Sequence, residues 1–194
     1  MVVIDSTIVL LILRPGTLVP NGSDGSPVSR PKDRIDYLVQ RLSKAKSKII
    51  IPTPVLSEAL VKAGPAASQK VIEELQKYAV FSIEPFDTRA ALEVAAMSRE
   101  ALASGNKKGK STAPWQKVKF DRQIVAIAKV HGVSEIYSDD SDIAALSERA
   151  KIKVIRLVDL PLPPTKAQLD LQLEPAPDFE PTAGFIEAIS SDEA

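Results

Sequence analysis

The sequence predicts an α/β fold in which helices cover both faces of a central, mainly parallel sheet. Short β-branched runs alternate along the chain with longer segments whose apolar residues recur at helical spacing, a pattern typical of parallel α/β sheets. The runs are apolar at consecutive positions, as in residues 2–4 and 49–51, which indicates strands buried on both faces. The first strand ends on Asp5, at the sheet edge where open α/β folds place their ligand sites.

Residues that typically begin and end helices mark the secondary-structure elements of the first half of the chain. An apolar run after Asp5 predicts a short buried helix. Asp33 is expected to cap the next helix, and Thr53 with Pro54 to open the one after it. Proline, glycine and serine dominate residues 14–32, which predicts an inserted surface loop. The strands expected in this half cover residues 2–4, 48–51 and 80–83, and the helices cover residues 8–13, 33–45, 54–63 and 67–78.

Residues of the same kinds mark the helices and strands of the second half. Asp87 is expected to open an alanine-rich helix. Residues 104–118 are rich in lysine and predict a second inserted loop. Asp121 then falls in the first turn of the next helix, which Gly132 stops. The strands expected here cover residues 135–138 and 153–155, and the helices cover residues 87–103, 120–130 and 143–150.

Length and charge favour one domain followed by a tail. With 194 residues and 44% hydrophobic content the chain can bury one core, which we assign to residues 1–158. Residues 159–194 are rich in proline and acids and predict a flexible tail. From Pro161 onward seven acids face one base, so the rest of this neutral chain is basic, which is compatible with a polyanionic partner.

Missing residue types narrow the chemistry. No apolar run reaches the roughly 18 residues of a membrane span, and the N-terminus does not resemble a secretion signal, so we expect no membrane segment and a cytoplasmic location. The absence of cysteine excludes disulfides and thiolate chemistry. His131 is the single histidine, so a metal would have to be held by oxygen ligands.

Four acids from separate segments are expected at the carboxyl edge of the sheet. Asp5 and Asp140 follow strands, and Glu58 lies in the first two turns of a helix that leaves its strand. Asp121 opens a crossover helix and shares its apolar stripe, so it points inward. Each acid alone has a structural explanation, because Asp5 and Asp140 could cap helices, Asp121 could favour a helix dipole and Glu58 could be solvated.

Together the acids indicate metal-dependent chemistry. Four carboxylates in one cleft repel one another, and protonation or a divalent cation relieves that repulsion. Oxygen ligands in a partly exposed cleft suit Mg²⁺ or Mn²⁺, which also bind substrate phosphates. Such ions activate a water and stabilise the leaving oxygen of a phosphodiester. The pattern therefore predicts phosphodiester hydrolysis.

The motifs around these acids match a known family. They are Val3-Ile4-Asp5-Ser6-Thr7, Ile51-Pro52-Thr53-Pro54-Val55-Leu56-Ser57-Glu58, Phe120-Asp121-Arg122-Gln123-Ile124-Val125-Ala126-Ile127-Ala128 and Tyr137-Ser138-Asp139-Asp140-Ser141-Asp142. Across residues 1–158 the chain resembles the PIN domain family of metal-dependent ribonucleases, especially the VapC-like toxins of type II toxin–antitoxin systems. The resemblance implies a PIN-like three-layer α/β/α fold and endonucleolytic cleavage of RNA, single-stranded or structured. It also implies a homodimer and a cognate antitoxin protein as a partner.

The resemblance also assigns roles to single residues. The catalytic and metal-binding acids would be Asp5, Glu58, Asp121 and Asp140. Asp142 would be a further metal ligand, and Ser138 a small hydroxyl residue at the substrate site. The implied cofactor is Mg²⁺ or Mn²⁺. The chain departs from the compact toxins in its loops at residues 14–32 and 104–118 and in its acidic tail.

The basic loop and Arg122 are candidate substrate contacts. Lys107, Lys108 and Lys110 surround Trp115, so the loop could hold phosphates while a base stacks on the indole. The alternative, which we prefer for the loop, is a solvated segment that Trp115 pins to the body. Arg122 is a candidate phosphate contact because it adjoins a proposed metal ligand.

Other functions fit the motifs less well. A haloacid dehalogenase-type phosphatase needs a second acid where Thr7 stands. A P-loop enzyme needs a strand before its Gly-Lys-Ser triplet, and none is expected before residues 109–111. A dinucleotide fold needs a glycine-rich first turn, which is missing after the first strand. A PIN-like module that binds RNA or protein without cutting stays open as the alternative.

Overall fold

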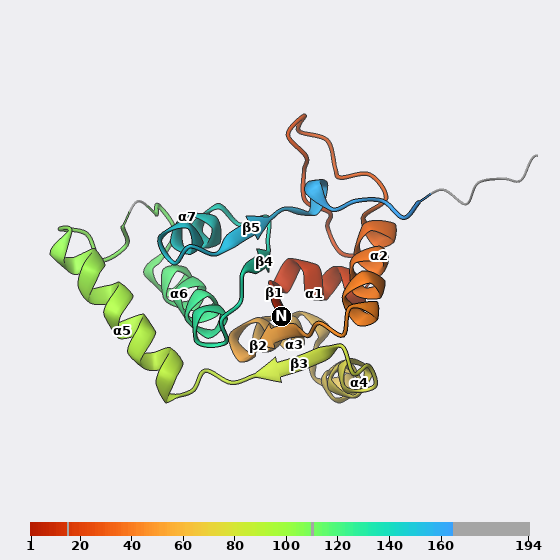
Figure 1. The fold of residues 1–194 in the computed structure, drawn as a ribbon, viewed down its shortest axis with the longest axis horizontal. Helices are drawn as coiled ribbons and strands as arrows, with labels where there is room; N and C mark the ends of the chain where they lie inside the picture. Colours follow the sequence, from red (N-terminus) through yellow and green to blue (C-terminus); the bar gives the residue numbers. More distant parts are fainter. Residues whose placement is uncertain (15, 110, 165–194) are drawn as a thin grey trace, which may run out of the picture. The chain divides into compact units, whose positions relative to one another are not determined.

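A computed structural model of the chain describes residues 1–14, 16–109 and 111–164. Five parallel strands form the central sheet in the order β3-β2-β1-β4-β5 (Figure 1). The strands are β1 (Val2–Ile4), β2 (Ile49–Pro52), β3 (Phe81–Glu84), β4 (Glu135–Tyr137) and β5 (Lys153–Ile155). The predicted fold class is confirmed, and each of these strand pairings is parallel.

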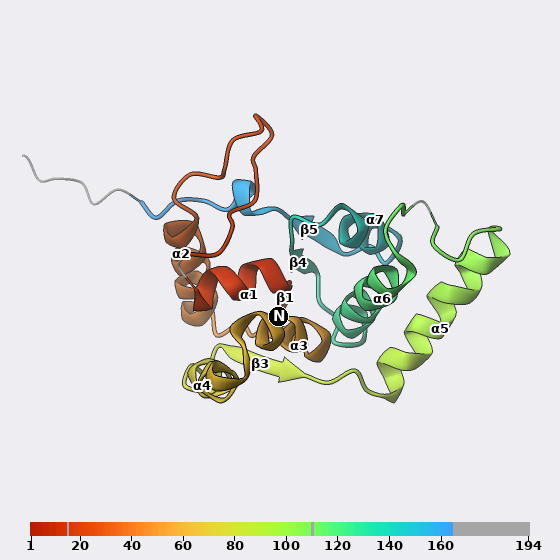
Figure 2. The ribbon, with the colours of Figure 1, turned by 180° about the vertical axis from the view of Figure 1, so that it is seen from behind.

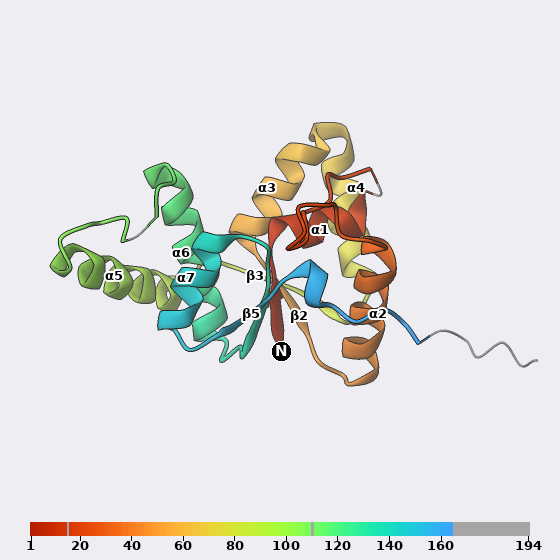
Figure 3. The ribbon, with the colours of Figure 1, turned by 90° about the horizontal axis from the view of Figure 1, so that it is seen from above.

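Helices cover both faces of the sheet and make the fold three-layered. The helices are α1 (Ser6–Leu13), α2 (Pro31–Lys44), α3 (Thr53–Ala63), α4 (Pro65–Gln76), α5 (Thr88–Ala103), α6 (Trp115–Val130) and α7 (Ser141–Arg149). The chain winds from β1 to β3 in one direction and from β4 to β5 in the other, so right-handed crossovers place α1–α4 and α5–α7 on opposite faces. Figure 3 shows the two groups on either side of the strands, and Figure 2 shows them from behind Figure 1. Of the helices in the described ranges, none has the length and apolarity to cross a membrane.

The three central strands are the most deeply buried part of the sheet. Val3 in β1, Ile49 and Ile51 in β2 and Ile136 in β4 are 0% exposed, as their consecutive apolar residues predicted. Helix α6 adds an unbroken buried run, residues 124–128. The edge strands β3 and β5 are only partly buried. The carboxyl ends of β1 and β4 therefore project from the most rigid part of the molecule.

The basic loop is shorter than predicted. Helix α6 begins at Trp115 with Pro114 as its N-cap residue, so the loop covers residues 104–114 and the prediction of 104–118 is wrong at its end. The first turn of α6 is Trp115-Gln116-Lys117-Val118, and the prediction included it in the loop because Gln116 and Lys117 continue the polar, lysine-rich run. Asp121 is consequently the seventh residue of the helix and does not lie in its first turn.

The earlier loop also ends sooner than predicted. Helix α2 begins at Pro31, and its N-cap residue is Arg30 in a left-handed conformation with φ of 51°. The capping role predicted for Asp33 is therefore wrong. Asp33 lies in the first turn, where its carboxylate pairs with Arg30 Nε at 2.7 Å. The inserted loop covers residues 14–30, and a bridge between Asn21 and Pro27 closes its tip.

The packed body extends slightly past the last strand. A short 3₁₀ helix, η1 (Leu157–Asp159), follows β5, and Leu157 and Leu160 are 0% and 2% exposed. Arg34 of α2 donates to the backbone carbonyls of Val158 and Leu160, which ties this segment to the body. Most of the predicted tail, residues 165–194, lies outside the described residues.

Candidate active site

The candidate site lies where the winding direction of the sheet reverses. Strands β1 and β4 are neighbours, with Ile4 opposite Tyr137, and the connections that leave them run to opposite faces. Open α/β sheets place ligand sites in the crevice outside the carboxyl ends of two such strands. Asp5 follows β1 and Asp140 follows β4, so both predicted acids lie at this crevice.

Both acids are helix caps, and one serine links them. Asp5 is the N-cap residue of α1, where its Oδ1 accepts the Ile8 N–H at 3.0 Å. Asp140 is the N-cap residue of α7, where its Oδ1 accepts the Asp142 N–H at 2.7 Å. The Ser138 hydroxyl donates to Asp5 Oδ2 and accepts the Asp140 N–H at 3.0 Å. Ser138 is 0% exposed, and its hydroxyl joins the two acids, while its place at the substrate site stays a prediction.

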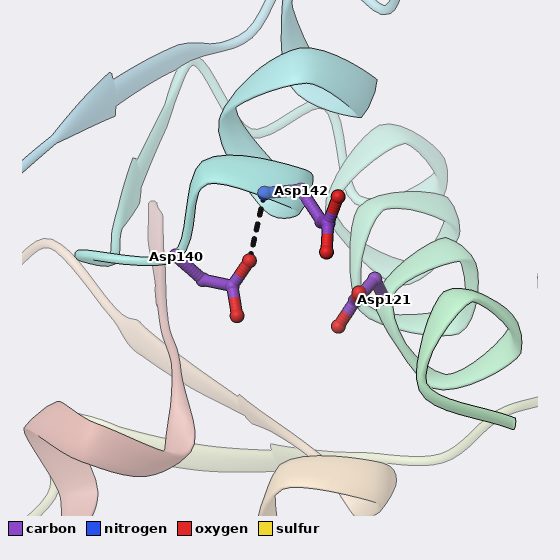
Figure 4. Close-up of side chains that lie close together, drawn as sticks. All are labelled: Asp121, Asp140 and Asp142. Carbon is purple, nitrogen blue, oxygen red and sulfur yellow. Dashed lines mark hydrogen bonds between the residues drawn. The ribbon is translucent and has the colours of Figure 1, made fainter. Parts of the chain in front are cut away.

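A compact cluster of three carboxylates stands beside Asp5. Asp121 from α6 and Asp140 and Asp142 from the start of α7 each place a carboxylate oxygen within 4.8 Å of the others. Figure 4 shows the three side chains facing one another across the gap between the two helices. Asp121 points inward as predicted from its place on the buried stripe of α6, and its side chain is 7% exposed. The cluster is hereafter called the three-acid cluster.

Lys117 is the residue of this site that the sequence prediction missed. Its Nζ lies 2.9 Å from Asp121 Oδ2, 2.8 Å from Asp140 Oδ2 and 3.0 Å from Asp142 Oδ2. The sequence prediction had placed it in the solvated basic loop. It lies instead one helical turn before Asp121 on α6, and this i, i+4 spacing would have revealed the pair had the helix start been recognised.

Glu58 and Asp5 line the same cleft at a greater distance from the cluster. The cleft has a volume of about 480 Å³, and its lining includes Asp5, Glu58, Lys117, Asp121 and Asp140. Glu58 is 50% exposed and pairs with Lys62 of the same helix at 2.9 Å. The structure thus brings the four predicted acids to one cleft, with Asp121, Asp140 and Asp142 in closest approach.

A family comparison agrees with this arrangement. The model of the PIN domain matches residues 26–149 of the chain, which is more than half of its length. The chain belongs to the PIN domain family. Glu58, Asp121, Asp140 and Asp142 lie inside the matched segment, and Asp5 precedes it.

Solved structures share the fold of this PIN domain at low sequence identity. One is a FitAB complex bound to an IR36 DNA fragment, with 19% identity, a TM-score of 0.55, and coverage of 83% of this chain and 98% of that chain. Another is VapBC2 from Rickettsia felis bound to a DNA fragment from its promoter, with 12% identity, a TM-score of 0.53, and coverage of 80% and 98%. None of the curated protein sequences matches the chain significantly.

Burial keeps two acids of the PIN domain hard to ionise. Burial raises the pKa of Asp5 to about 6, although hydrogen bonds from Ser138 and the Ile8 N–H oppose the rise. Burial also raises the pKa of Asp121 to about 6, although Lys117 opposes it. At Asp142 burial is outweighed by hydrogen bonds from Lys117 and Ser111, so the pKa falls below its usual value. The buried carboxylates therefore gain from any cation that enters the cleft.

The donor set fits a hard divalent cation. The three-acid cluster offers carboxylate oxygens alone, which Mg²⁺ and Mn²⁺ prefer over softer ligands. An ammonium group already lies within 3.0 Å of all three carboxylates, so the cluster has the size and charge to enclose a cation. Asp121, Asp140 and Asp142 would hold such an ion, and Asp5 and Glu58 would face it from the rest of the cleft.

The predicted substrate contacts differ in their exposure. Arg122 is 2% exposed, donates to Ser98 Oγ at 3.1 Å and to the Lys107 carbonyl, and stacks on the Trp115 ring at 5.2 Å. This burial argues against the phosphate contact predicted for Arg122. Lys107 is exposed, and its Nζ lies over the same Trp115 ring, 5.3 Å from the ring centre.

The Lys108 ammonium donates within the loop, to the Ala113 carbonyl at 2.9 Å. Lys110 lies outside the described residues. Trp115 and Arg122 thus hold the 104–114 loop against α5 and α6, in agreement with the structural alternative that we preferred for the loop. Phosphate contact by Lys107, Lys108 and Lys110 stays a prediction.

Replacing Trp115 with alanine should release this loop without opening the fold. We expect trypsin to cleave after Lys107 or Lys108 several-fold faster in Trp115→Ala, because the indole that both Lys107 and Arg122 contact is lost. Phe120→Ala is the matched control, since Phe120 lies on the same helix and is 47% exposed. Equal cleavage rates at these lysines in the two variants would show that Trp115 does not hold the loop.

Proposed function

We propose that this PIN domain is a divalent-metal-dependent endoribonuclease. The observation that carries the proposal is the convergence of Asp5, Glu58, Asp121 and Asp140 on one cleft at the switch point of the sheet, with Asp142 clustered beside the last two. These acids come from four separate segments, and two of them, Asp5 and Asp140, are held in place by hydrogen bonds from backbone N–H groups. Helix capping alone explains Asp5 and Asp140 but not Asp121, whose carboxylate lies buried in the second turn of a helix.

The cleft is suited to the hydrolysis of a phosphodiester. A divalent cation held by the three-acid cluster would supply the positive charge that stabilises a reacting phosphate and activates a water. Glu58 lines the cleft and is half exposed, so its carboxylate would be open to an attacking water and could accept a proton from it. Hydrogen bonds from Lys62 and Ser6 outweigh burial and hold its pKa below the usual value, so it is ionised at neutral pH. Asp5 lines the cleft although it is only 4% exposed, and Ser138 links its carboxylate to the Asp140 backbone N–H.

We further propose that the protein acts as the toxin of a toxin–antitoxin pair, with a cognate antitoxin as its partner. Two structures with the same fold are two-component complexes, FitAB and VapBC2, each bound to DNA. By analogy, the DNA contact in such a pair would belong to the complex with the partner, and the RNA contact to the acidic cleft of this chain. The homodimer and the cytoplasmic location implied by the resemblance stay predictions.

A cleavage assay on the full chain tests the proposed activity. The purified protein should cut a labelled single-stranded or hairpin RNA in Mg²⁺ or Mn²⁺ and leave it intact in EDTA, because phosphate hydrolysis at this site depends on the cation. Returning excess Mn²⁺ to the EDTA sample should restore cutting. Cleavage that persists unchanged in EDTA would contradict the assignment of the metal site.

A second function is favoured by one specific observation. Lys117 already compensates part of the charge of the three-acid cluster, as expected of a PIN-like module that binds RNA or protein without cutting. Such a module would slow the migration of RNA in a gel-shift assay without cutting it. It would also show no Mn²⁺ binding in calorimetry. Binding of Mn²⁺ in the micromolar to millimolar range together with RNA cleavage would exclude it.

A further inference from the structure

The cation that the three-acid cluster holds in the structure is a lysine side chain. Lys117 Nζ lies 2.9, 2.8 and 3.0 Å from one oxygen each of Asp121, Asp140 and Asp142. These are the carboxylates that would hold a divalent ion (Figure 4). Within the described part of the chain, no other basic side chain forms a salt bridge with any of the three.

We propose that the Lys117 ammonium is a built-in competitor for the metal position, which a divalent cation displaces when it binds. The inference rests on the proposed metal-dependent function and adds a control on the metal affinity of that site. In this arrangement Lys117 holds the cluster together when no metal is bound. It also raises the metal concentration that is needed to fill the site.

Helix geometry alone does not explain the position of the ammonium. A lysine that precedes an acid by four residues has the less favourable order for a helical ion pair, and Lys117 precedes Asp121 in this way. The side chain also reaches across to α7, where it contacts Asp140 and Asp142. The ammonium is therefore placed by the charge of the whole cluster, and not by one pair on α6.

Charge and distance make the ammonium and the metal alternatives. One ammonium faces three carboxylates and compensates only one of their negative charges. A divalent ion in its place would compensate two. A Mg²⁺ ion binds carboxylate oxygens at about 2.0–2.1 Å, and it would use the same oxygens that now accept from Lys117. Two cations that share these oxygens would repel each other strongly in a partly buried cleft.

The lysine can leave the cluster without a change in the fold. Its side chain is 39% exposed and lines the open cleft beside Glu58 and Phe120. A four-carbon stem lets the ammonium turn toward solvent while the backbone of α6 stays in place. Displacement therefore breaks the three salt bridges of Lys117 and leaves the packing of the core unchanged.

Metal binding by lysine variants tests the proposal. We expect Lys117→Met to bind Mn²⁺ at least about tenfold more tightly than the wild-type chain in calorimetry, because the competing charge is gone. Lys119→Met is the matched control, since Lys119 lies two residues further along α6, is exposed and removes the same charge. Its affinity should stay within about twofold of wild type. Affinity in Lys117→Met that equals or falls below that of Lys119→Met overturns the proposal.

Two further measurements cover the case in which Lys117→Met does not fold. Lys117→Arg keeps the charge, so its Mn²⁺ affinity should stay near wild type or fall, and a tenfold gain would overturn the proposal. In the wild-type chain, reductive methylation of Lys117, measured by peptide mass, should be slow without metal and several-fold faster in saturating Mg²⁺. An unchanged rate at Lys117, with Lys119 as internal reference, would also overturn it.

These readouts separate this inference from the proposed function. Tighter Mn²⁺ binding in Lys117→Met supports the competitor role even if the wild-type chain cuts no RNA. Metal-dependent RNA cleavage without a gain in Mn²⁺ affinity in Lys117→Met leaves the nuclease assignment intact and overturns the competitor role. Absence of Mn²⁺ binding in every variant overturns the competitor role together with the metal site.

Discussion

Asp140→Asn should reduce metal-dependent RNA cleavage by about 100-fold or more, in line with the loss of a catalytic group. Asparagine keeps the oxygen that caps α7, where Oδ1 accepts the backbone N–H groups of Asp142 and Ile143, and it is as good an N-cap residue as aspartate. The substitution removes the negative charge of Oδ2, which faces the cluster. The fold should therefore persist while the site loses one of its three clustered carboxylates. Initial rates of RNA cleavage at saturating Mn²⁺ measure the effect.

Asp87→Asn is a close control for this substitution. Asp87 is the N-cap residue of α5, and its Oδ1 accepts the Ala90 N–H at 2.9 Å, so the chemical change and the capping role are the same. It is absent from the lining of the acidic cleft. We expect cleavage within about twofold of wild type. If Asp140→Asn and Asp87→Asn lose activity equally, the effect comes from helix capping and Asp140 is not a metal ligand.

The fold and the acidic edge could be predicted because they depend on local patterns. Consecutive β-branched residues marked β1 and β2 as doubly buried strands, and each acid that follows such a strand has to lie at the carboxyl edge. Asp121 was placed correctly although its helix start was wrong. The reason is that an apolar stripe fixes which face of a helix is buried, whatever residue the helix begins with.

The parts that could not be predicted depend on where a polar segment begins to fold. Residues 115–118 still carry a glutamine and a lysine beside the lysine-rich loop, so the prediction included them in the loop, whereas in the structure Trp115 already packs against Arg122 from the first turn of the helix. Lys117 was therefore assigned to solvent although it reaches the centre of the site. Arg30 took the N-cap position that Asp33 was expected to fill, because Pro31 already sets the first helical turn.

Burial of charge was equally hard to predict. Arg122 was assigned to a phosphate because it adjoins Asp121, a proposed metal ligand. Its guanidinium is instead enclosed by the Trp115 ring, Ser98 and the Lys107 carbonyl. These partners come from α5, α6 and the loop between them, so no spacing within one segment reveals them. Contacts between distant segments decide where the basic side chains lie, whereas the ends of β1 and β4 decide where Asp5 and Asp140 lie.

Ser138→Ala should weaken both the fold and the activity, because one hydroxyl joins the two acids that end β1 and β4. Without it, Asp5 Oδ2 and the Asp140 N–H lose their shared partner in a place where Ser138 is 0% exposed. Leaving such buried groups unpaired costs about 1–3 kcal/mol. We expect the free energy of unfolding to fall by that amount in urea titrations. Cleavage should fall about tenfold, because Asp140 is held less firmly.

The same substitution should shift the pH dependence of cleavage toward alkaline pH. The Ser138 hydrogen bond stabilises the Asp5 carboxylate and so lowers a pKa that burial has raised to about 6. Its loss raises the pKa of Asp5 further, so a higher pH is needed to ionise Asp5, and the acidic limb of the rate profile should move upward. A purely structural role for Ser138 would lower the rate equally at every pH.

Ser147→Ala is the control that distinguishes the loss of the Ser138 hydrogen bonds from the loss of a buried hydroxyl alone. Ser147 is also 0% exposed, but among the described residues its Oγ finds no hydrogen-bond partner. Removing an unpaired buried hydroxyl should leave the free energy of unfolding within about 0.5 kcal/mol of wild type or raise it, because no bond is lost. Equal destabilisation in Ser138→Ala and Ser147→Ala would mean that Ser138 contributes only volume. A loss confined to Ser138→Ala would make this hydroxyl the link through which the sheet positions the acids of the cleft.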